Sequence, residues 1–311
     1  MGMTGSGKGG RKTMARVVII VVAVLAALVV AGACALAGFT MTGSRQTLDE
    51  ARAWQQERYD TSFYDEVAGP EYTVEGAGGY VLHVQLLENP EPCDRYVIIS
   101  HGYTDNRMGS LKYARFYLDM GFNCIIYDLR GHGANEPTFT TYGVLEGQDL
   151  ALLVADTRMR YEDISQLGLH GESLGAACTI SSLAYDPEVD FVVADCGFES
   201  IERVLRDGYR TAGVPEVLFD LADLGARLRY GHALKDARPI DALDGSTVPI
   251  LFIHGADDPF IVPANSQDMY ERAMGPREIR LVDGAGHAES ALVAPELYQQ
   301  ILEEYLAGLA G

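Results

Sequence analysis

A serine between two glycines stands in the sequence GESLG at 171–175. A short apolar run (167–171) that predicts a strand comes before it, and a segment with helical spacing (174–185) follows. G-x-S-x-G between a strand and a helix predicts a sharp turn that lifts the serine hydroxyl out of the sheet. Such a hydroxyl attacks carbonyl carbons when a neighbouring base accepts its proton. Ser173 is therefore the candidate nucleophile.

A base and an acid for this serine follow later in the chain. His287 stands in the glycine-rich sequence GAGHAES after a predicted strand, and Asp257 and Asp258 follow the strand ILFIHG. The order serine, aspartate, histidine is that of one known arrangement of the catalytic triad. We expect His287 to be the base and Asp258 the acid that orients it. Asp257 is an alternative acid, and so is Asp195 at the end of its own strand.

Attack on a carbonyl creates a negatively charged oxygen, which backbone N–H groups can stabilise. The N–H of Leu174, one residue after the nucleophile, is one candidate donor. Tyr103, in the loop that closes the strand at 95–100, is the other. This chemistry uses only protein groups, so we expect neither a metal ion nor an organic cofactor.

The elements that must position these residues alternate along the chain. Short β-branched runs bounded by Gly, Asp or Pro predict strands, and they alternate with segments of helical spacing. This pattern predicts an α/β fold whose mostly parallel central sheet has helices on both faces. The predicted strands are 80–88, 95–100, 122–128, 167–171, 191–195, 250–255 and 279–283, and the predicted helices are 109–120, 145–161, 174–185, 263–274 and 290–309.

One segment interrupts this alternation. Residues 197–240 are helical in composition, contain aromatic residues and lie between two predicted strands. Ligands of open α/β sheets bind beyond the carboxyl ends of the strands, so a long insertion there is well placed to cover them. We therefore predict a helical cap at about 197–240, although an elaborate crossover connection fits the same pattern.

Composition and charge limit the function classes. The chain has 311 residues, of which 48% are hydrophobic and 22% charged, as expected of a globular protein. Its net charge is −20, and four basic residues with no acid stand in residues 1–16. The rest therefore carries −24 (−20 minus 4). So acidic a body repels phosphate backbones, and we expect no binding to nucleic acid.

Residues 17–39 contain no charge and no proline. A helix of this length, at about 1.5 Å per residue, crosses a hydrocarbon core of about 30 Å. With the basic segment 1–16 before it, we predict an uncleaved signal anchor, a single-pass protein of the cell membrane, and a domain outside the cytoplasm. The small residues at 31–35 also fit a cleaved signal peptide or a weak lipid-attachment site. Residues 40–60 are expected to form a stalk or first helix, and 61–311 the main domain.

Five motifs together resemble those of serine hydrolases with the α/β-hydrolase fold. They are HGYTDN (101–106), YDLRGHG (127–133), GESLG (171–175), HGADDPFIVP (254–263) and GAGHAES (284–290). The chain is most similar to membrane-anchored bacterial proteins with serine aminopeptidase or prolyl-oligopeptidase-like domains. This resemblance implies Ser173 as nucleophile, His287 as base and Asp258 as acid. Pro263 comes one residue later than in those relatives, so Asp257 stays open as the acid.

Three functions are compatible with these residues. The first is hydrolysis of a carboxylic ester or related acyl bond in a small molecule, through an acyl-enzyme. The second is peptide hydrolysis with the same triad, in which Glu172 or the acidic cap would hold the α-amine of an aminopeptidase substrate. The third is a binding protein that uses a hydrolase scaffold without catalysis. Because all triad positions are filled, we favour an enzyme, and an esterase over a peptidase.

Overall fold

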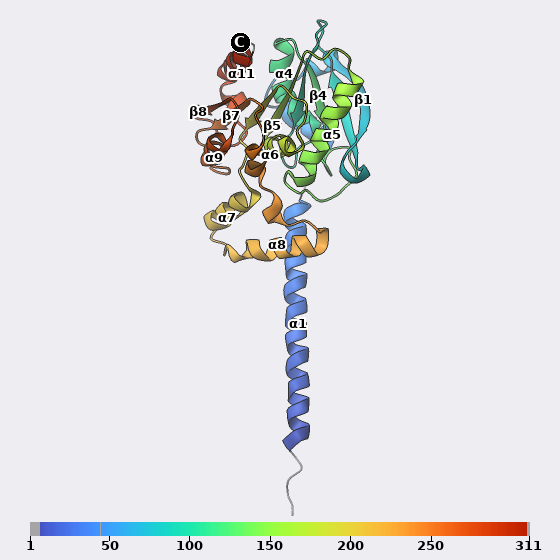
Figure 1. The fold of residues 1–311 in the computed structure, drawn as a ribbon, viewed down its shortest axis with the longest axis vertical. Coiled ribbons are helices and arrows are strands. Elements are labelled where there is room, and N and C mark those ends of the chain that lie inside the picture. The colour runs from blue at the N-terminus through green and yellow to red at the C-terminus, as the bar shows by residue number, and fades with distance from the viewer. Residues whose placement is uncertain (1–6, 44, 310–311) are drawn as a thin grey trace, which may run out of the picture.

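Eight strands form one sheet in the computed structural model, which describes residues 7–43 and 45–309 (Figure 1). The strand order is β1-β2-β4-β3-β5-β6-β7-β8, in which the pairs β1–β2 and β2–β4 are antiparallel and all pairs from β4 to β8 are parallel. The predicted mostly parallel sheet is therefore confirmed. The strands are β1 (Ala68–Glu75), β2 (Val81–Leu87), β3 (Arg95–Ser100), β4 (Asn123–Tyr127), β5 (Gln166–Glu172), β6 (Phe191–Asp195), β7 (Ile250–Gly255) and β8 (Arg277–Val282).

Strand β1 is absent from the sequence prediction. Its sequence AGPEYTVE contains Gly69 and Pro70, residues that weaken a strand, and most of its residues are exposed. The strand forms because it pairs with β2, and the register shifts between Ala68 and Glu71. This edge strand thus depends on a partner rather than on its own pattern.

Helices cover both faces of the sheet, as predicted, and Figure 1 shows them on either side of the strands. The α-helices of the described residues are α1 (Gly7–Met41), α2 (Leu48–Gln56), α3 (Tyr64–Val67), α4 (Leu111–Asp119), α5 (Val144–Arg160), α6 (Leu174–Ser182), α7 (Ile201–Thr211), α8 (Val217–Tyr230), α9 (Ala264–Arg272), α10 (Ser290–Val293) and α11 (Pro295–Leu309).

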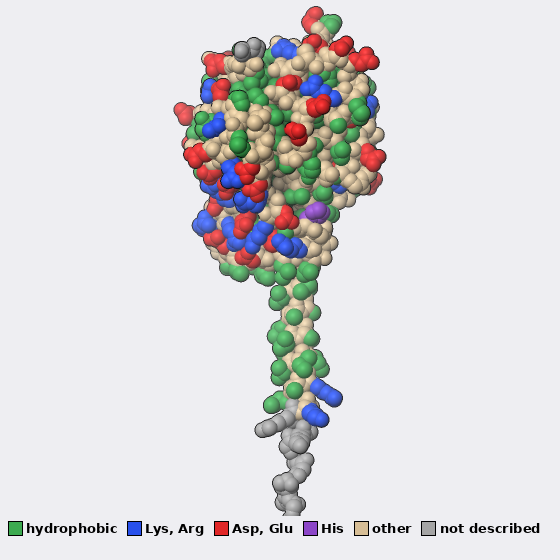
Figure 2. Space-filling view, viewed as in Figure 1, with side chains coloured by type: hydrophobic (Ala, Val, Ile, Leu, Met, Phe, Trp, Pro, Cys, Tyr) green, Lys and Arg blue, Asp and Glu red, His purple; other side chains and the backbone are tan. Residues whose placement is uncertain are grey.

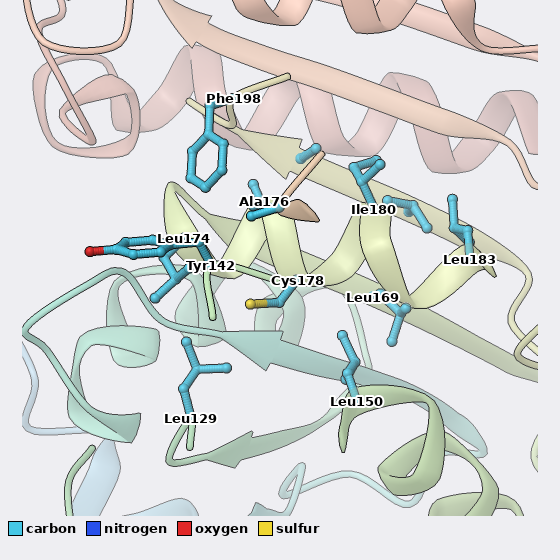
Figure 3. Packing of buried hydrophobic residues seen from close by; sticks show 14 of the residues in the cluster. Leu129, Tyr142, Leu150, Leu169, Leu174, Ala176, Cys178, Ile180, Leu183 and Phe198 are labelled. Carbon is cyan, nitrogen blue, oxygen red and sulfur yellow. The ribbon is translucent and has the colours of Figure 1, made fainter. Parts of the chain in front are cut away.

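The sheet separates two hydrophobic cores. Because side chains alternate across a strand, Ile98 faces one core while Val97 and Ile99 face the other. Helices α5 and α6 close the first core, where Ala176 and Ile180 of α6 pack over the sheet (Figure 3). Helices α4 and α11 close the second. The central strands are thus buried on both faces, which fixes their carboxyl ends in place.

The first helix extends away from this body (Figure 1). Over Lys12–Met41 this helix is long and apolar enough to cross a membrane. Its last turns enter the body, because Ala37 and Met41 belong to the first hydrophobic core. Of the basic segment predicted at 1–16, residues 1–6 and the side chains of Lys8 and Arg11 lie outside the described part.

The segment between β6 and β7, where we predicted a cap, contains α7 and α8 together with two short 3₁₀ helices, Leu234–Asp236 and Pro239–Asp244. Figure 1 shows α8 lying across α1, between the body and the free part of that helix. Residues 40–60, predicted to form a stalk or first helix, hold α2, which packs on the body through buried Ala51 and Gln55.

Candidate active site

Ser173 occupies the turn from β5 into α6. Its backbone has φ 54° and ψ −112°, a strained conformation for a residue with a side chain. The flanking glycines allow this turn, because a Cβ on Gly175 would lie 2.1 Å from the carbonyl oxygen of Ser100 and one on Gly171 2.3 Å from that of Gly175. The Ser173 N–H donates to the carbonyl of Asp195 at 2.8 Å. The turn is therefore held from both neighbouring strands.

The structure brings Ser173, His287 and Asp258 together. The Oγ of Ser173 lies 2.9 Å from Nε2 of His287, and Nδ1 of the same ring lies 2.7 Å from Oδ2 of Asp258. His287 follows β8 and Asp258 follows β7, so the carboxyl edge of the parallel sheet gathers all three side chains. Both distances suit proton transfer from the hydroxyl to an oriented imidazole.

Asp258 is held as a carboxylate by its surroundings. Its burial favours the neutral acid, but hydrogen bonds with His254 and His287 outweigh this and lower the pKa of the carboxyl group. The N–H groups of Phe260 and Ile261 also donate to its Oδ1, at 2.8 and 2.9 Å. Asp257, in contrast, is exposed to solvent. The geometry thus favours Asp258 over Asp257 as the partner of His287.

Asp195, the other alternative acid, takes part in a different contact. Its Oδ2 accepts hydrogen bonds from the hydroxyls of Tyr113 and Tyr298, at 3.1 and 3.0 Å. Burial, reinforced by the charge of Glu172, raises the pKa of Asp195 to about 6. Asp195 therefore contributes to the buried layer beneath the nucleophile rather than to the orientation of His287.

The loop with the candidate oxyanion donor Tyr103 is braced from two sides. The His101 ring bonds to the Leu129 N–H through Nε2 at 2.9 Å, and its Nδ1 lies 2.8 Å from the Gly102 carbonyl. On the other side, the Tyr103 hydroxyl accepts from the Gly43 N–H at 3.1 Å and donates to the Thr40 carbonyl at 3.4 Å. Leu174 begins α6 directly after Ser173. The end of α1 thus contacts the loop on which one donor stands.

Lys112 is a site residue that the sequence analysis missed. Its ammonium forms an ion pair with Glu172, the residue before Ser173, and donates to the carbonyl of Ala288, the residue after His287, at 2.9 Å. Although burial opposes it, the charge of Lys112 lowers the pKa of Glu172. Lys112 therefore ties the serine turn to the histidine loop. It stands in α4, outside all five motifs, and no local signal in the sequence points to it.

A pocket of about 390 Å³ opens beside these residues. It is lined by Tyr103, Glu172 and His287 and, from α2 and the turn after it, by Trp54 and Arg58. Asp105 also lines it, and burial raises the pKa of that carboxyl to about 7. Helix α2 and the turn after it therefore form one wall of the candidate site.

Comparison with known proteins agrees with this arrangement. Residues 97–299 match the model of the alpha/beta hydrolase family. An uncharacterized Bacillus subtilis protein, YqkD, is 31% identical over 255 residues, covering 78% of this chain and 81% of that protein. Human alpha/beta hydrolase domain-containing protein 17B is 30% identical over 224 residues, which cover 68% of this chain and 65% of that protein.

Solved structures share the fold. An esterase from Pyrococcus furiosus, Pf2001, superimposes with a TM-score of 0.66 at 24% identity, over 81% of this chain and 96% of the esterase. An esterase from Exiguobacterium antarcticum gives a TM-score of 0.58 at 16% identity, over 76% and 100% of the two chains. At these identities the similarity concerns the fold.

Proposed function

Because the chain belongs to the alpha/beta hydrolase family, we propose that it is a serine hydrolase of carboxylic esters or related acyl bonds. The observation that carries this proposal is the hydrogen-bonded series Ser173–His287–Asp258 at the carboxyl edge of the sheet. The strained backbone of Ser173 supports it, because a strained serine between strand and helix is a feature of nucleophile turns.

In the proposed reaction, the Oγ of Ser173 attacks the carbonyl carbon while Nε2 of His287 takes the hydroxyl proton. Asp258 holds the ring through Nδ1 and stabilises the imidazolium. The backbone N–H groups of Tyr103 and Leu174 are proposed to bind the oxyanion. The intermediate then expels the alcohol, which receives the proton from His287 and leaves an acyl-enzyme. Water attacks this ester with His287 again as base, and the carboxylic acid departs.

The neighbourhood of Glu172 favours an ester over a peptide substrate. An aminopeptidase needs a free carboxylate to hold the α-amine of its substrate. Glu172, the candidate for that role, is already paired with Lys112 and accepts from the Tyr113 hydroxyl at 2.7 Å. We therefore propose esters as the main substrates and keep peptidase activity as the alternative to test.

We also propose that α1 stays attached as a single membrane anchor, with the hydrolase domain at 61–311 outside the cytoplasm and its cap at about 197–240. The burial of Ala33, Ala37 and Met41 supports retention of the helix, because cleavage among the small residues at 31–35 would disrupt contacts of the folded body. Protease protection of the full chain in membrane vesicles tests the orientation.

Hydrolysis of p-nitrophenyl esters from acetate to palmitate tests the activity, with aminoacyl anilides measured in parallel. We expect ester turnover that Ser173→Ala abolishes, and the chain length of the best substrate gives the depth of the acyl pocket. Turnover of anilides alone would move the assignment to a peptidase. Absence of both activities in a folded protein would favour a binding role for the scaffold.

A further inference from the structure

Helix α8 carries an outward-facing apolar stripe. The stripe consists of Val217, Leu221, Leu224 and Leu228, whose spacing of four, three and four residues places them on one side of a helix. Val217, Leu224 and Leu228 are 60%, 41% and 57% exposed. The opposite side packs into the first core through buried Phe219, Ala222 and Ala226. One side of α8 thus packs on the body, while the side with the stripe stays largely exposed among the described residues.

Helix α8 is fixed against α1 by a close backbone contact. A Cβ on Gly225 would lie 2.0 Å from the carbonyl oxygen of Ala33, so only glycine permits this approach. Arg229 extends the contact by donating to the carbonyl of Cys34 at 3.1 Å. Figure 1 shows α8 lying across α1, and the contact of Gly225 places the crossing at Ala33.

The crossing point lies where a membrane span would end. Every residue from Lys12 to Gly32 is exposed, whereas Ala33 is buried by α8. The uncharged residues from Val17 to Gly32 extend about 24 Å at about 1.5 Å per residue. The long side chains of Arg16 and Lys12 reach from the preceding turns to the headgroups, so the segment spans a hydrocarbon core of about 30 Å. Lys12 and Arg16 stand at one end of this length and α8 at the other.

The distribution of side chains on the surface agrees with this level. Figure 2 shows hydrophobic side chains along the lower edge of the body, continuous with those of α1, and Lys, Arg, Asp and Glu gathered directly above them. Phe39, one turn and a half past the crossing, is 83% exposed. At about 1.5 Å per residue, Phe39 lies about 9 Å beyond Ala33, where its exposed ring meets the headgroup layer.

We propose that α8 lies in the plane of the membrane, with the stripe Val217, Leu221, Leu224 and Leu228 inserted at the boundary between headgroups and acyl chains. An in-plane helix binds a bilayer through such an apolar face. The lipid bilayer is the occupant that the continuity with α1 favours. The inference rests on the proposed role of α1 as a membrane span.

This placement names a substrate class. The Thr40 carbonyl, which accepts from the Tyr103 hydroxyl, stands seven residues after Ala33, or roughly 10 Å along α1. The loop with the candidate oxyanion donor is thus held close above the membrane surface. We infer that the substrates are acyl esters whose apolar chain lies in the same leaflet while their ester group reaches the interface.

The placement of α8 is testable with the full chain in phosphatidylcholine and phosphatidylglycerol vesicles. In a Cys34→Ala, Cys93→Ser background, single cysteines at Leu224→Cys and Leu228→Cys receive an environment-sensitive fluorophore. Lipids with a spin label near the headgroup should quench both probes at least about twofold more than a probe at Met159→Cys. Met159 is a matched control because it is apolar, 80% exposed and on α5.

A probe at Leu25→Cys, quenched by a spin label deep in the acyl chain, reports insertion of α1. Water-like emission at 224 and 228 with Leu25→Cys quenched would overturn the inference and leave the span intact. Loss of quenching at all three positions would overturn both. If the probes at 224 and 228 are shielded from both water and lipid, and the protein is a dimer in solution, the stripe binds a second copy of the chain. That result would overturn the membrane role.

The substrate class has its own test. The double variant Leu224→Asp, Leu228→Asp should hydrolyse p-nitrophenyl acetate at the unaltered rate but lose severalfold in turnover of a long-chain ester embedded in vesicles, while Met159→Asp loses nothing. Equal rates on the embedded ester would contradict delivery from the membrane. If no variant shows turnover that depends on Ser173, the proposed function fails, and the quenching result on α8 still stands.

Discussion

Replacement of Lys112 by methionine should both destabilise the protein and slow its reaction. The ammonium of Lys112 joins the residue before Ser173 to the residue after His287, through the ion pair with Glu172 and the hydrogen bond to the Ala288 carbonyl. Both partners of the ion pair are largely buried, with side-chain exposures of 5% for Lys112 and 13% for Glu172. Methionine keeps most of the apolar stem and removes the charge.

The expected loss of stability follows from the Glu172 carboxylate that stays buried in the variant. Loss of one partner leaves a buried carboxylate without its counter-ion, which costs about 3–5 kcal/mol. At about 2 °C per kcal/mol for a domain of this size, the midpoint of thermal unfolding should fall by roughly 6–10 °C. Displacement of the serine turn against the histidine loop by about 1 Å lowers catalysis by up to about 100-fold.

The double variant Lys112→Met, Glu172→Gln provides the matched control. It removes both charges, so it should recover much of the lost stability, while the tie between the two loops stays broken and kcat/KM stays low. The pKa of Glu172 lies below its ordinary value of 4.5 in the folded protein. The pair therefore stabilises the fold above about pH 4.5, and its contribution is lost as the pH falls through the folded-state pKa.

Thermal unfolding of the full chain in detergent and ester turnover at the same pH measure both effects. A Lys112→Met variant within about 1 kcal/mol of the parent, or a double variant as unstable as the single one, would refute the reasoning from an uncompensated buried charge. Unaltered kcat/KM in the single variant would refute a positioning role for Lys112.

Three further predictions concern the acid, the pocket and the helix contact. Asp258→Asn should lower kcat by about 10⁴-fold, whereas Asp257→Asn should leave it near the parent value, and the reverse result would exchange their roles. Because the pKa of Asp105 is raised to about 7, the buried carboxyl destabilises the folded state as the pH rises from the ordinary carboxyl range to about 7. Asp105→Asn should therefore raise the thermal midpoint when it is measured above pH 7 and leave it unchanged below about pH 4. A difference that does not depend on pH would contradict this. Gly225→Ala should lower the thermal midpoint because the new Cβ meets the α1 backbone. Gly208→Ala, which has open space around it, should be neutral or stabilise the protein by about 0.5–1 kcal/mol. Equal effects of the two variants would contradict the close contact.

The motifs predicted the family and the fold because their information is local. The predicted strand before Ser173, the glycines around it and the predicted helix after it stand within residues 167–185, and the family match and the parallel sheet confirm the fold that they indicated. The proximity of His287 and Asp258 to Ser173 could be predicted because parallel strands end at one edge of a sheet.

Other parts of the site depend on contacts that no sequence pattern reveals. Lys112 lies in the largely buried helix α4, and its contact with the loop after β8 forms only when the two segments pack together. Trp54 lines the pocket because α2, the first-helix alternative for residues 40–60, packs against the body. Strand β1 forms through its pairing with β2, and Gly225 has meaning only where α8 meets Ala33.

Covalent labelling of Ser173 tests the central claim most directly. The full chain is treated with a fluorophosphonate, and the modified residue is identified by mass spectrometry. We predict one adduct on Ser173, formed rapidly by the parent protein, slowly by His287→Ala and not by Ser173→Ala. A folded parent protein that leaves Ser173 unmodified, or that reacts at the same rate after His287→Ala, would contradict the assignment of Ser173 as a nucleophile activated by His287.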